Sequence, residues 1–274
     1  MNVEVAANKR FLDTSATQSA RDWDELLVSQ VDLSIANELG MLLSLDKWNR
    51  SEAVIDAGCG NGYYLAALRS FFPEKRFLGV DISPELIAAA SHRHPEIEFQ
   101  QADFFALQAE PADVLMMRFI VQHLGDFRSI LRQASRVLRP DGALIIVEAD
   151  LARSLVRPLP TAFHGMLETY AAVSTNDGGL KTRLLSDPEG LVADSGEPWR
   201  LAEIRDSATA MVGPFVGGNL ATVFGKWVDL AERSAMFAFD FEAVRTELQE
   251  WSTLPASFVN LVTRMFVFEQ IRPT

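Results

Sequence analysis

Hydrophobic and polar positions in the middle of the chain alternate between short apolar runs and longer segments with apolar residues at helical spacing. The runs are AVIDAG from Ala53, RFLGVDI from Arg76, IEFQQAD from Ile97, ADVLMMRF from Ala112 and ALIIVEAD from Ala143. Residues 114–117 and 144–147 are continuously apolar, which is typical of parallel strands covered on both faces. The pattern therefore predicts successive βαβ units and a doubly wound α/β core over residues 51–150.

Helices are predicted within this core and also before and after it along the chain. Ser83 followed by Pro84 marks a helix start, and RPDG at residues 139–142 is expected to close a helix before the strand ALIIVE. Residues 1–50 are predicted to be helical, a helical insertion is expected over about 210–255, and TRMFVFEQIR is expected to be the last strand. Because no repeat or linker interrupts the chain, we expect one domain over residues 1–274, with residues 151–274 on the substrate side.

Composition narrows the function. The 274 residues are 48% hydrophobic and 23% charged, and acidic residues outnumber basic ones 37 to 25, giving a net charge of −12. Because nucleic acid is bound through Lys and Arg, this balance favours a small-molecule substrate over nucleic acid. No apolar window of about 18 residues and no signal peptide is recognised, so we expect a cytoplasmic protein without a membrane partner. Whether it forms a homodimer is left open.

Metal and disulfide chemistry are not expected. Cys59 is the single cysteine, and the four histidines lie at scattered positions without ligand spacing. Cys59 also stands inside a glycine-rich loop, where a small buried residue is the expected interpretation rather than a nucleophile. The sequence thus predicts no metal.

The loop VIDAGCGNG, from Val54 to Gly62, carries the most specific signal. In an open α/β sheet, the loop after the first strand is the usual ligand cradle. A dinucleotide fingerprint would place its third glycine where Tyr63 stands, whereas this loop reads D-x-G-x-G-x-G from Asp56. Asp56 would repel a pyrophosphate and accept hydrogen bonds from an ammonium group, although a short glycine run can also be a simple tight turn.

Two further aspartates end the next strands. Asp81 lies nineteen residues beyond Gly62, where a carboxylate accepts hydrogen bonds from ribose hydroxyls. Asp103 follows IEFQQA and would lie near an adenine edge, or would cap a helix. Glycine cradle and aspartates together indicate a nucleoside bearing an amino acid, and S-adenosylmethionine is such a molecule.

At this point the chain resembles the class I S-adenosylmethionine-dependent methyltransferases over about residues 50–150. The resemblance rests on VIDAGCGNG, GVDIS, QQADFF, DVLMMRFIVQHLGD and VLRPDGALIIVEAD. The last two motifs are similar to the ubiquinone-biosynthesis-like branch of small-molecule methyltransferases. The resemblance implies a Rossmann-like, mostly parallel seven-stranded sheet whose last strand is antiparallel, with N-terminal helices and a helical lid insertion.

The resemblance also implies which residues hold the cofactor. Asp56 and the backbone of the glycine loop would hold the methionyl end, and Ile82 would cover one adenine face. The main chain at Arg118 would help to hold the amino group. The full set implied is Asp56, Gly58, Cys59, Gly60, Gly62, Asp81, Ile82, Asp103, Phe104 and Arg118.

Catalysis should rest mainly on aligning the acceptor with the methyl group, which can lower the barrier by about 7–11 kcal/mol. A base is needed only where the acceptor must lose a proton. His123 is a candidate base, or else packs or caps a helix. Arg118 would orient a carboxylate or enolate, or pair with an acid. Glu148 and Asp150 would bind a cationic acceptor, or lie in salt bridges, and the remaining substrate-side candidates are His164 and Phe215. The aromatic residues of the insertion form either core or an apolar lid.

We therefore predict a cytoplasmic S-adenosylmethionine-dependent methyltransferase that acts on an oxygen or nitrogen atom, with carbon next, of a small apolar molecule in secondary metabolism. S-adenosylhomocysteine would be the second product. Two alternatives stay open: an enzyme of the same fold that uses the cofactor without consuming it, in a cyclisation or decarboxylation, and a regulatory module that binds the cofactor.

Overall fold

The computed structural model describes residues 17–175, 179–212, 214–234, 237–254 and 258–271. The chain divides into two compact units. The first unit comprises Met1–Leu33, Asp150–Gly178 and Ala208–Val262, and the second comprises Ser34–Ala149, Gly179–Ser207 and Thr263–Thr274. A single domain over residues 1–274 stays a prediction.

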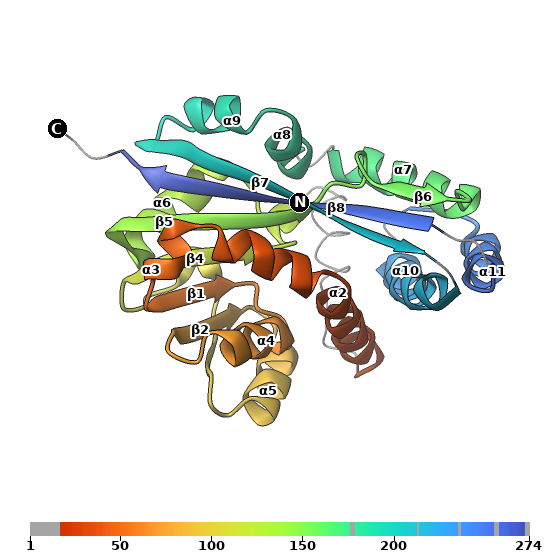
Figure 1. The fold of residues 1–274 in the computed structure, drawn as a ribbon, viewed down its shortest axis with the longest axis horizontal. Coiled ribbons are helices and arrows are strands. Elements are labelled where there is room, and N and C mark those ends of the chain that lie inside the picture. The colour runs from red at the N-terminus through yellow and green to blue at the C-terminus, as the bar shows by residue number, and fades with distance from the viewer. Residues whose placement is uncertain (1–16, 176–178, 213, 235–236, 255–257, 272–274) are drawn as a thin grey trace. The chain divides into compact units, whose positions relative to one another are not determined.

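Five parallel strands form the centre of the second unit (Figure 1). They follow the order β3-β2-β1-β4-β5, which places the first strand in the middle and the crossovers on either side of it. Their bounds are Ala53–Ala57 (β1), Arg76–Asp81 (β2), Glu98–Gln101 (β3), Ala112–Arg118 (β4) and Leu138–Ala149 (β5). The predicted doubly wound core is confirmed. Its order switches between β1 and β4, where ligands bind in such sheets.

The sheet continues beyond β5 through β8 (Phe258–Gln270), which is antiparallel to it. This confirms the expected antiparallel last strand, although it begins before TRMFVFEQIR. Both β6 (Leu155–Arg157) and β7 (Trp199–Val212) pair with β8. The sheet therefore has eight strands rather than the expected seven, because the short β6 adds one that its three residues did not signal.

The second unit also contains the crossover helices. Ser83 caps α5, as predicted, because its Oγ accepts a hydrogen bond from Leu86 N at 3.1 Å and Pro84 follows it. The bounds are Asp46–Arg50 (α3), Tyr63–Phe71 (α4), Pro84–Arg93 (α5), Phe127–Val137 (α6), Leu180–Ser186 (α8) and Pro188–Ser195 (α9), with 3₁₀ turns at Phe104–Ala106 (η1) and Val121–His123 (η2).

The RPDG segment differs from its prediction. α6 ends at Val137 and β5 begins at Leu138, so RPDG lies inside the strand. The pairing of β5 with β4 shifts here, from Ala112↔Leu138 to Val114↔Ala143. The extra residues bulge out of the ladder because Pro140 has no backbone N–H to give it.

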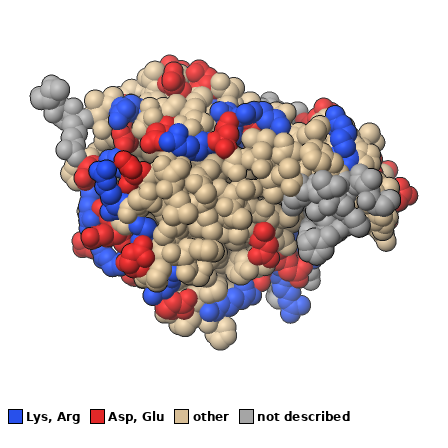
Figure 2. All heavy atoms as spheres, in the orientation of Figure 1, with Lys and Arg blue, Asp and Glu red and all other residues tan. Residues whose placement is uncertain are grey.

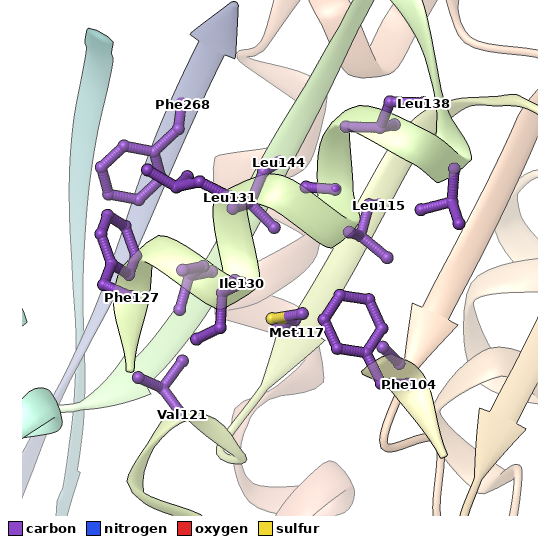
Figure 3. Packing of buried hydrophobic residues seen from close by; sticks show 14 of the residues in the cluster. Phe104, Leu115, Met117, Val121, Phe127, Ile130, Leu131, Leu138, Leu144 and Phe268 are labelled. Carbon is purple, nitrogen blue, oxygen red and sulfur yellow. The ribbon is translucent and has the colours of Figure 1, made fainter. Parts of the chain in front are cut away.

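Packing of α6 against the sheet fixes the carboxyl ends of β4 and β5. Ile130 and Leu131 on α6 point toward Leu115 and Met117 of β4, with Phe268 of β8 beside them (Figure 3). All five side chains are fully buried. Each such residue contributes about 1.5–3 kcal/mol by leaving water, so the strand ends are held rigidly.

The first unit is mainly helical, with a core of its own. Phe163 on α7 stacks on Phe224 of α10 with ring centroids 4.3 Å apart. Phe237, Phe239 and Phe241 also pack into this cluster, so these aromatic residues belong to the core, and a lid over the cofactor stays a prediction. The helices are Thr17–Leu43 (α2, continuing into the second unit), Thr161–Thr175 (α7), Pro214–Ser234 (α10) and Phe241–Ser252 (α11).

One part of α2, Arg21–Leu43, is long and apolar enough to cross a membrane by length and composition. No apolar window of this length was expected from the sequence, because Asp32 and Glu38 interrupt the run of apolar residues. A core helix of a soluble protein passes the same test.

On the face shown in Figure 2, basic and acidic side chains are interspersed.

Candidate active site

Asp56 stands near the carboxyl end of β1 and is 2% exposed. Its Oδ1 has no hydrogen-bond partner among the described residues. Burial raises the pKa of Asp56 to about 7; the Arg118 charge opposes this shift, whereas Asp81 and Glu38 add to it. A buried oxygen without a hydrogen-bond donor costs free energy, so a donor from a bound ligand would stabilise this position.

The loop after β1 is shaped by its glycines. Gly58, Gly60 and Gly62 have φ values of +81°, +56° and +75°, which L side chains rarely adopt. A Cβ on Gly58 would lie 2.5 Å from Ile120 Cδ1, and one on Gly62 would lie 2.6 Å from Phe99 Cζ. The glycines are therefore required by packing against the chain itself as well as by backbone conformation.

Cys59 lies in this loop and is buried. The backbone N–H groups of Gly58 and Cys59 both donate to Val80 O, at 2.7 and 3.1 Å, which ties the loop to β2. Burial raises the pKa of the Cys59 thiol well above its ordinary value, with the charges of Asp56 and Asp81 adding to the shift. The thiol therefore stays protonated and is no nucleophile, as the sequence predicted.

Asp81 orients the loop from the end of β2. Its Oδ2 accepts a hydrogen bond from Gly60 N and its Oδ1 accepts one from Ser83 N, both at 2.9 Å. Each carboxylate oxygen has a second lone pair, so two ribose hydroxyls can still donate to it. The neighbouring Ile82 side chain is 64% exposed and offers an open apolar face.

Asp103 caps η1, which was the alternative interpretation of this residue. Its Oδ1 accepts a hydrogen bond from Phe105 N at 2.9 Å. The residue is exposed, while Phe104 is buried in the core beside it. Capping fixes the backbone amide of Phe104 at the end of β3; contact of Asp103 and Phe104 with adenine stays a prediction.

Arg118 ends β4 and forms a buried ion pair with Glu38 on α2. Its Nε donates to both carboxylate oxygens of Glu38, at 3.1 and 2.9 Å, and its Nη2 donates to Ser34 Oγ at 2.8 Å. The guanidinium carbon also lies 4.7 Å from the ring centroid of Tyr64. Of the two roles predicted for this side chain, pairing with an acid is the one observed.

The chain turns sharply directly after Arg118. Phe119 adopts φ = +58°, the one described non-glycine residue with a positive φ. Such strained positions cluster at functional sites. Its N–H donates to Val147 O at 2.9 Å, so the turn is anchored to β5 and redirects the backbone where the amino group of the cofactor is expected.

Glu148, near the end of β5, lies close to the η2 turn that contains His123 and to Lys181 of α8. Glu148 is fully buried; its Oε1 accepts a hydrogen bond from Val121 N at 3.3 Å, and its Oε2 lies 3.0 Å from Lys181 Nζ. Lys181 Nζ also donates to Gln122 Oε1 at 3.5 Å. Burial, with the Lys181 charge, lowers the pKa of His123 to about 4, so its imidazole is neutral at pH 7.

Asp150 and His164 belong to the first unit. Asp150 Oδ1 accepts a hydrogen bond from Arg153 N at 3.2 Å and so closes the turn after β5. His164 Nε2 lies 3.2 Å from Glu168 Oε1 on the exposed side of α7. Both have structural partners, and their substrate roles stay predictions. The side chain of Phe215 lies outside the described residues.

Sequence reasoning missed Glu38, Tyr64 and Lys181. A signal existed for Glu38, because IANELGML places an acid on an otherwise apolar helix face. Nothing comparable marked Lys181, which lies 33 positions after Glu148, its partner in the ion pair.

These residues fit the expected cofactor. The unpartnered oxygen of Asp56 suits an ammonium group, Asp81 suits a ribose, and the three glycines allow the loop between them to follow its left-handed backbone path. A pyrophosphate would face the buried carboxyl of Asp56, which disfavours a dinucleotide. Binding of the methionyl and ribose ends of S-adenosylmethionine at these positions stays a prediction.

Comparison with known proteins agrees with this geometry. A family described as "Methyltransferase domain" matches residues 49–186. Over 98 residues, the chain is 38% identical to trans-aconitate 2-methyltransferase of Methylobacterium nodulans, covering 35% of this chain and 38% of the relative. Over 165 residues, it is 31% identical to malonyl-[acyl-carrier protein] O-methyltransferase of Hahella chejuensis, covering 59% of this chain and 57% of the relative.

A third relative is 6-hydroxytryprostatin B O-methyltransferase of Aspergillus fumigatus, 29% identical over 168 residues that cover 57% of this chain and 46% of the relative. The chain thus spans between 38% and 57% of these three relatives. Among solved structures, the plantazolicin methyltransferase BpumL in complex with SAH aligns with a TM-score of 0.55 at 16% identity, covering 98% of this chain and 96% of that one. At this identity the likeness concerns the fold.

Proposed function

Since the chain belongs to the methyltransferase-domain family, we propose that it transfers a methyl group from S-adenosylmethionine to an oxygen atom of a small organic molecule. Family membership confirms the predicted resemblance, enzyme class and cofactor; the ubiquinone-like branch stays a prediction. The observation that carries the proposal is the buried, unpartnered Oδ1 of Asp56 beside the glycine loop.

The chain's own residues have separate tasks in binding the cofactor, which supplies a methyl group on an electrophilic sulfonium. Asp56 accepts from an ammonium group, and the glycine loop leaves room for the methionyl chain. Asp81 accepts from ribose hydroxyls, while exposed Ile82 covers one adenine face. Because Asp81 and the glycine loop are held by backbone hydrogen bonds before the ligand arrives, little order is lost there on binding.

The pair Lys181 and Glu148, with His123, supports an oxygen acceptor. A hydroxyl must lose its proton as it attacks, and His123 is the candidate acceptor. Its pKa of about 4 leaves the imidazole neutral but a weak base, so a neighbouring cation has to stabilise the charge that develops on the oxygen. The Lys181 ammonium favours the negative charge that develops on the oxygen. A cationic amine would instead have to displace Lys181 from Glu148, which counts against the predicted cationic acceptor at Glu148.

Two of the relatives are named O-methyltransferases, which agrees with an oxygen acceptor. The chain spans only part of their length, so the reaction is proposed from its own residues. Secondary metabolism and a cytoplasmic location belong to the same proposal. Nitrogen as the acceptor atom remains the second candidate.

Matched acceptors test the proposal. Purified protein and cofactor labelled at the methyl group would be offered three single-ring aromatic compounds that differ only in a hydroxyl, carboxyl or amino group. The proposal expects label on oxygen, in the hydroxyl or carboxyl compound, with one S-adenosylhomocysteine formed per label. Labelling of the amine alone would move the acceptor atom to nitrogen.

The rival uses of the cofactor are tested with cell extract as the acceptor source. We expect one labelled small molecule and unlabelled nucleic acid. If a substrate is instead consumed while the cofactor stays intact, and S-adenosylhomocysteine supports the reaction equally well, the methyl-transfer proposal fails in favour of cofactor use without consumption. Binding without any turnover would favour a regulatory module.

A further inference from the structure

We propose that Glu38 is a positioning residue for the cofactor: it holds the Arg118 guanidinium so that Asp56 Oδ1 stays available for the α-ammonium group. The inference rests on the assigned cofactor. It gives a role to a buried acid on α2 that lies outside the glycine loop and outside residues 49–186, which the family match covers.

The geometry of the pair supports this role. Glu38 is fully buried, the Arg118 side chain is 6% exposed, and both carboxylate oxygens accept hydrogen bonds from a single nitrogen, Nε. Ser34 Oγ accepts from Nη2 at 2.8 Å. The guanidinium carbon also lies close to two rings, 4.7 Å from the centroid of Tyr64 and 4.1 Å from that of Phe119. Arg118 is therefore fixed in position by Glu38 and Ser34 of α2 and by both rings.

Charge explains why the position matters. Three neighbouring charges shift the pKa of Asp56 on β1: those of Arg118 on β4, Asp81 on β2 and Glu38 on α2. Arg118 is the one cation among them, and Asp56 Oδ1 nevertheless has no donor. Without the charge of Glu38, the same guanidinium would be attracted to Asp56, the other buried carboxyl whose charge raises the pKa of Arg118. The Arg118 guanidinium would then donate to Asp56 Oδ1, the oxygen that is proposed to accept from the ligand.

A pair of ligands separates this role from general stability. S-adenosylhomocysteine carries the α-ammonium group, whereas 5′-methylthioadenosine keeps the nucleoside and lacks the amino acid. For Glu38→Gln, we expect affinity for S-adenosylhomocysteine to fall about 10- to 100-fold, as for loss of a charged hydrogen bond. Affinity for 5′-methylthioadenosine should stay within about threefold, because Asp81 is untouched. Calorimetric titration measures both.

Two variants control for the charge. Ser34→Ala removes one hydrogen bond of Arg118 and leaves its charge paired, so affinity for S-adenosylhomocysteine should fall less than in Glu38→Gln, and affinity for 5′-methylthioadenosine should stay within about threefold of the wild type. In Glu38→Gln/Arg118→Met both charges are gone, Asp56 Oδ1 is again without an internal donor, and affinity for S-adenosylhomocysteine should recover relative to the single variant. The double variant also avoids an unpaired buried charge, so it keeps the test valid if Glu38→Gln folds poorly.

The pH profile gives an independent readout. In the wild type, affinity for S-adenosylhomocysteine should rise with pH up to the Asp56 pKa of about 7, and in Glu38→Gln this rise should disappear, because pairing with Arg118 lowers that pKa. Equal losses of affinity for both ligands, or an unchanged profile, would overturn the role of Glu38. Binding of neither ligand by the wild type would instead overturn the cofactor assignment and the inference with it.

Discussion

Replacing Asp81 by Ala should weaken cofactor binding without abolishing the fold. Its carboxylate holds Gly60 N and Ser83 N at 2.9 Å each and has lone pairs left for two ribose hydroxyls. Hydrogen bonds to a charged group are worth about 1.5–3 kcal/mol each, and water replaces part of this at a site open beside Ile82. We therefore expect a net loss of about 1–3 kcal/mol, which is about a 5- to 150-fold rise in Kd.

The same substitution leaves two backbone donors without their acceptor. Gly60 N is part of the cradle, and an unsatisfied buried donor costs about 1–3 kcal/mol of the free energy of unfolding. A matched control separates the two effects: Asp240 caps α11 by accepting from Ala243 N at 3.0 Å, so Asp240→Ala should lose about 1 kcal/mol of stability with Kd unchanged.

Calorimetric titration with S-adenosylhomocysteine, together with urea unfolding of both variants, decides the matter. The reasoning would be refuted by an unchanged Kd in Asp81→Ala, which would mean that the end of β2 does not hold the ribose. A Kd that rises equally in Asp240→Ala would show that lost stability, rather than a lost contact, weakens binding.

Further predictions concern titration and turnover. Asp56 keeps its proton up to about pH 7 when folded but only to about 3.8 when unfolded, so the free energy of unfolding of the unliganded protein should fall as pH rises between these values; a flat profile in urea unfolding would contradict the raised pKa. His123→Gln should lower turnover about 10²- to 10⁴-fold with the cofactor Kd unchanged. A change below about threefold with a lower Tm would assign His123 to packing. Lys181→Met should lower kcat/KM more for a hydroxyl acceptor than for its amine analogue, and equal losses would exclude charge stabilisation on oxygen.

The glycine loop and the strand-end aspartates proposed to hold the cofactor could be located from the sequence because their determinants are local. Asp56 and the glycines lie within one loop, and Asp81 ends the next strand, so apolar runs and spacing were enough. The partners of Arg118 and Glu148 in their ion pairs were not predictable. Glu38 lies 80 positions from Arg118, and no spacing rule links an acid on one helix to the end of a distant strand.

The misread elements have physical causes as well. RPDG has the composition of a turn, but pairing of β5 with β4 on both sides of it draws the segment into a bulged strand. β6 has three residues, too few for an alternation to be recognised. Asp103 was open between two roles because a carboxylate that caps a turn looks, in sequence, like one that awaits a ligand.

The central claim is that the carboxyl of Asp56 beside the glycine loop selects an ammonium-bearing nucleoside. Calorimetric titration of the wild type above the Asp56 pKa of about 7, with S-adenosylmethionine, S-adenosylhomocysteine and NAD in turn, tests it most directly. We expect saturable binding of the first two and none of NAD, because a pyrophosphate would face a buried carboxylate. Tight binding of NAD with no response to either sulfur compound would contradict it.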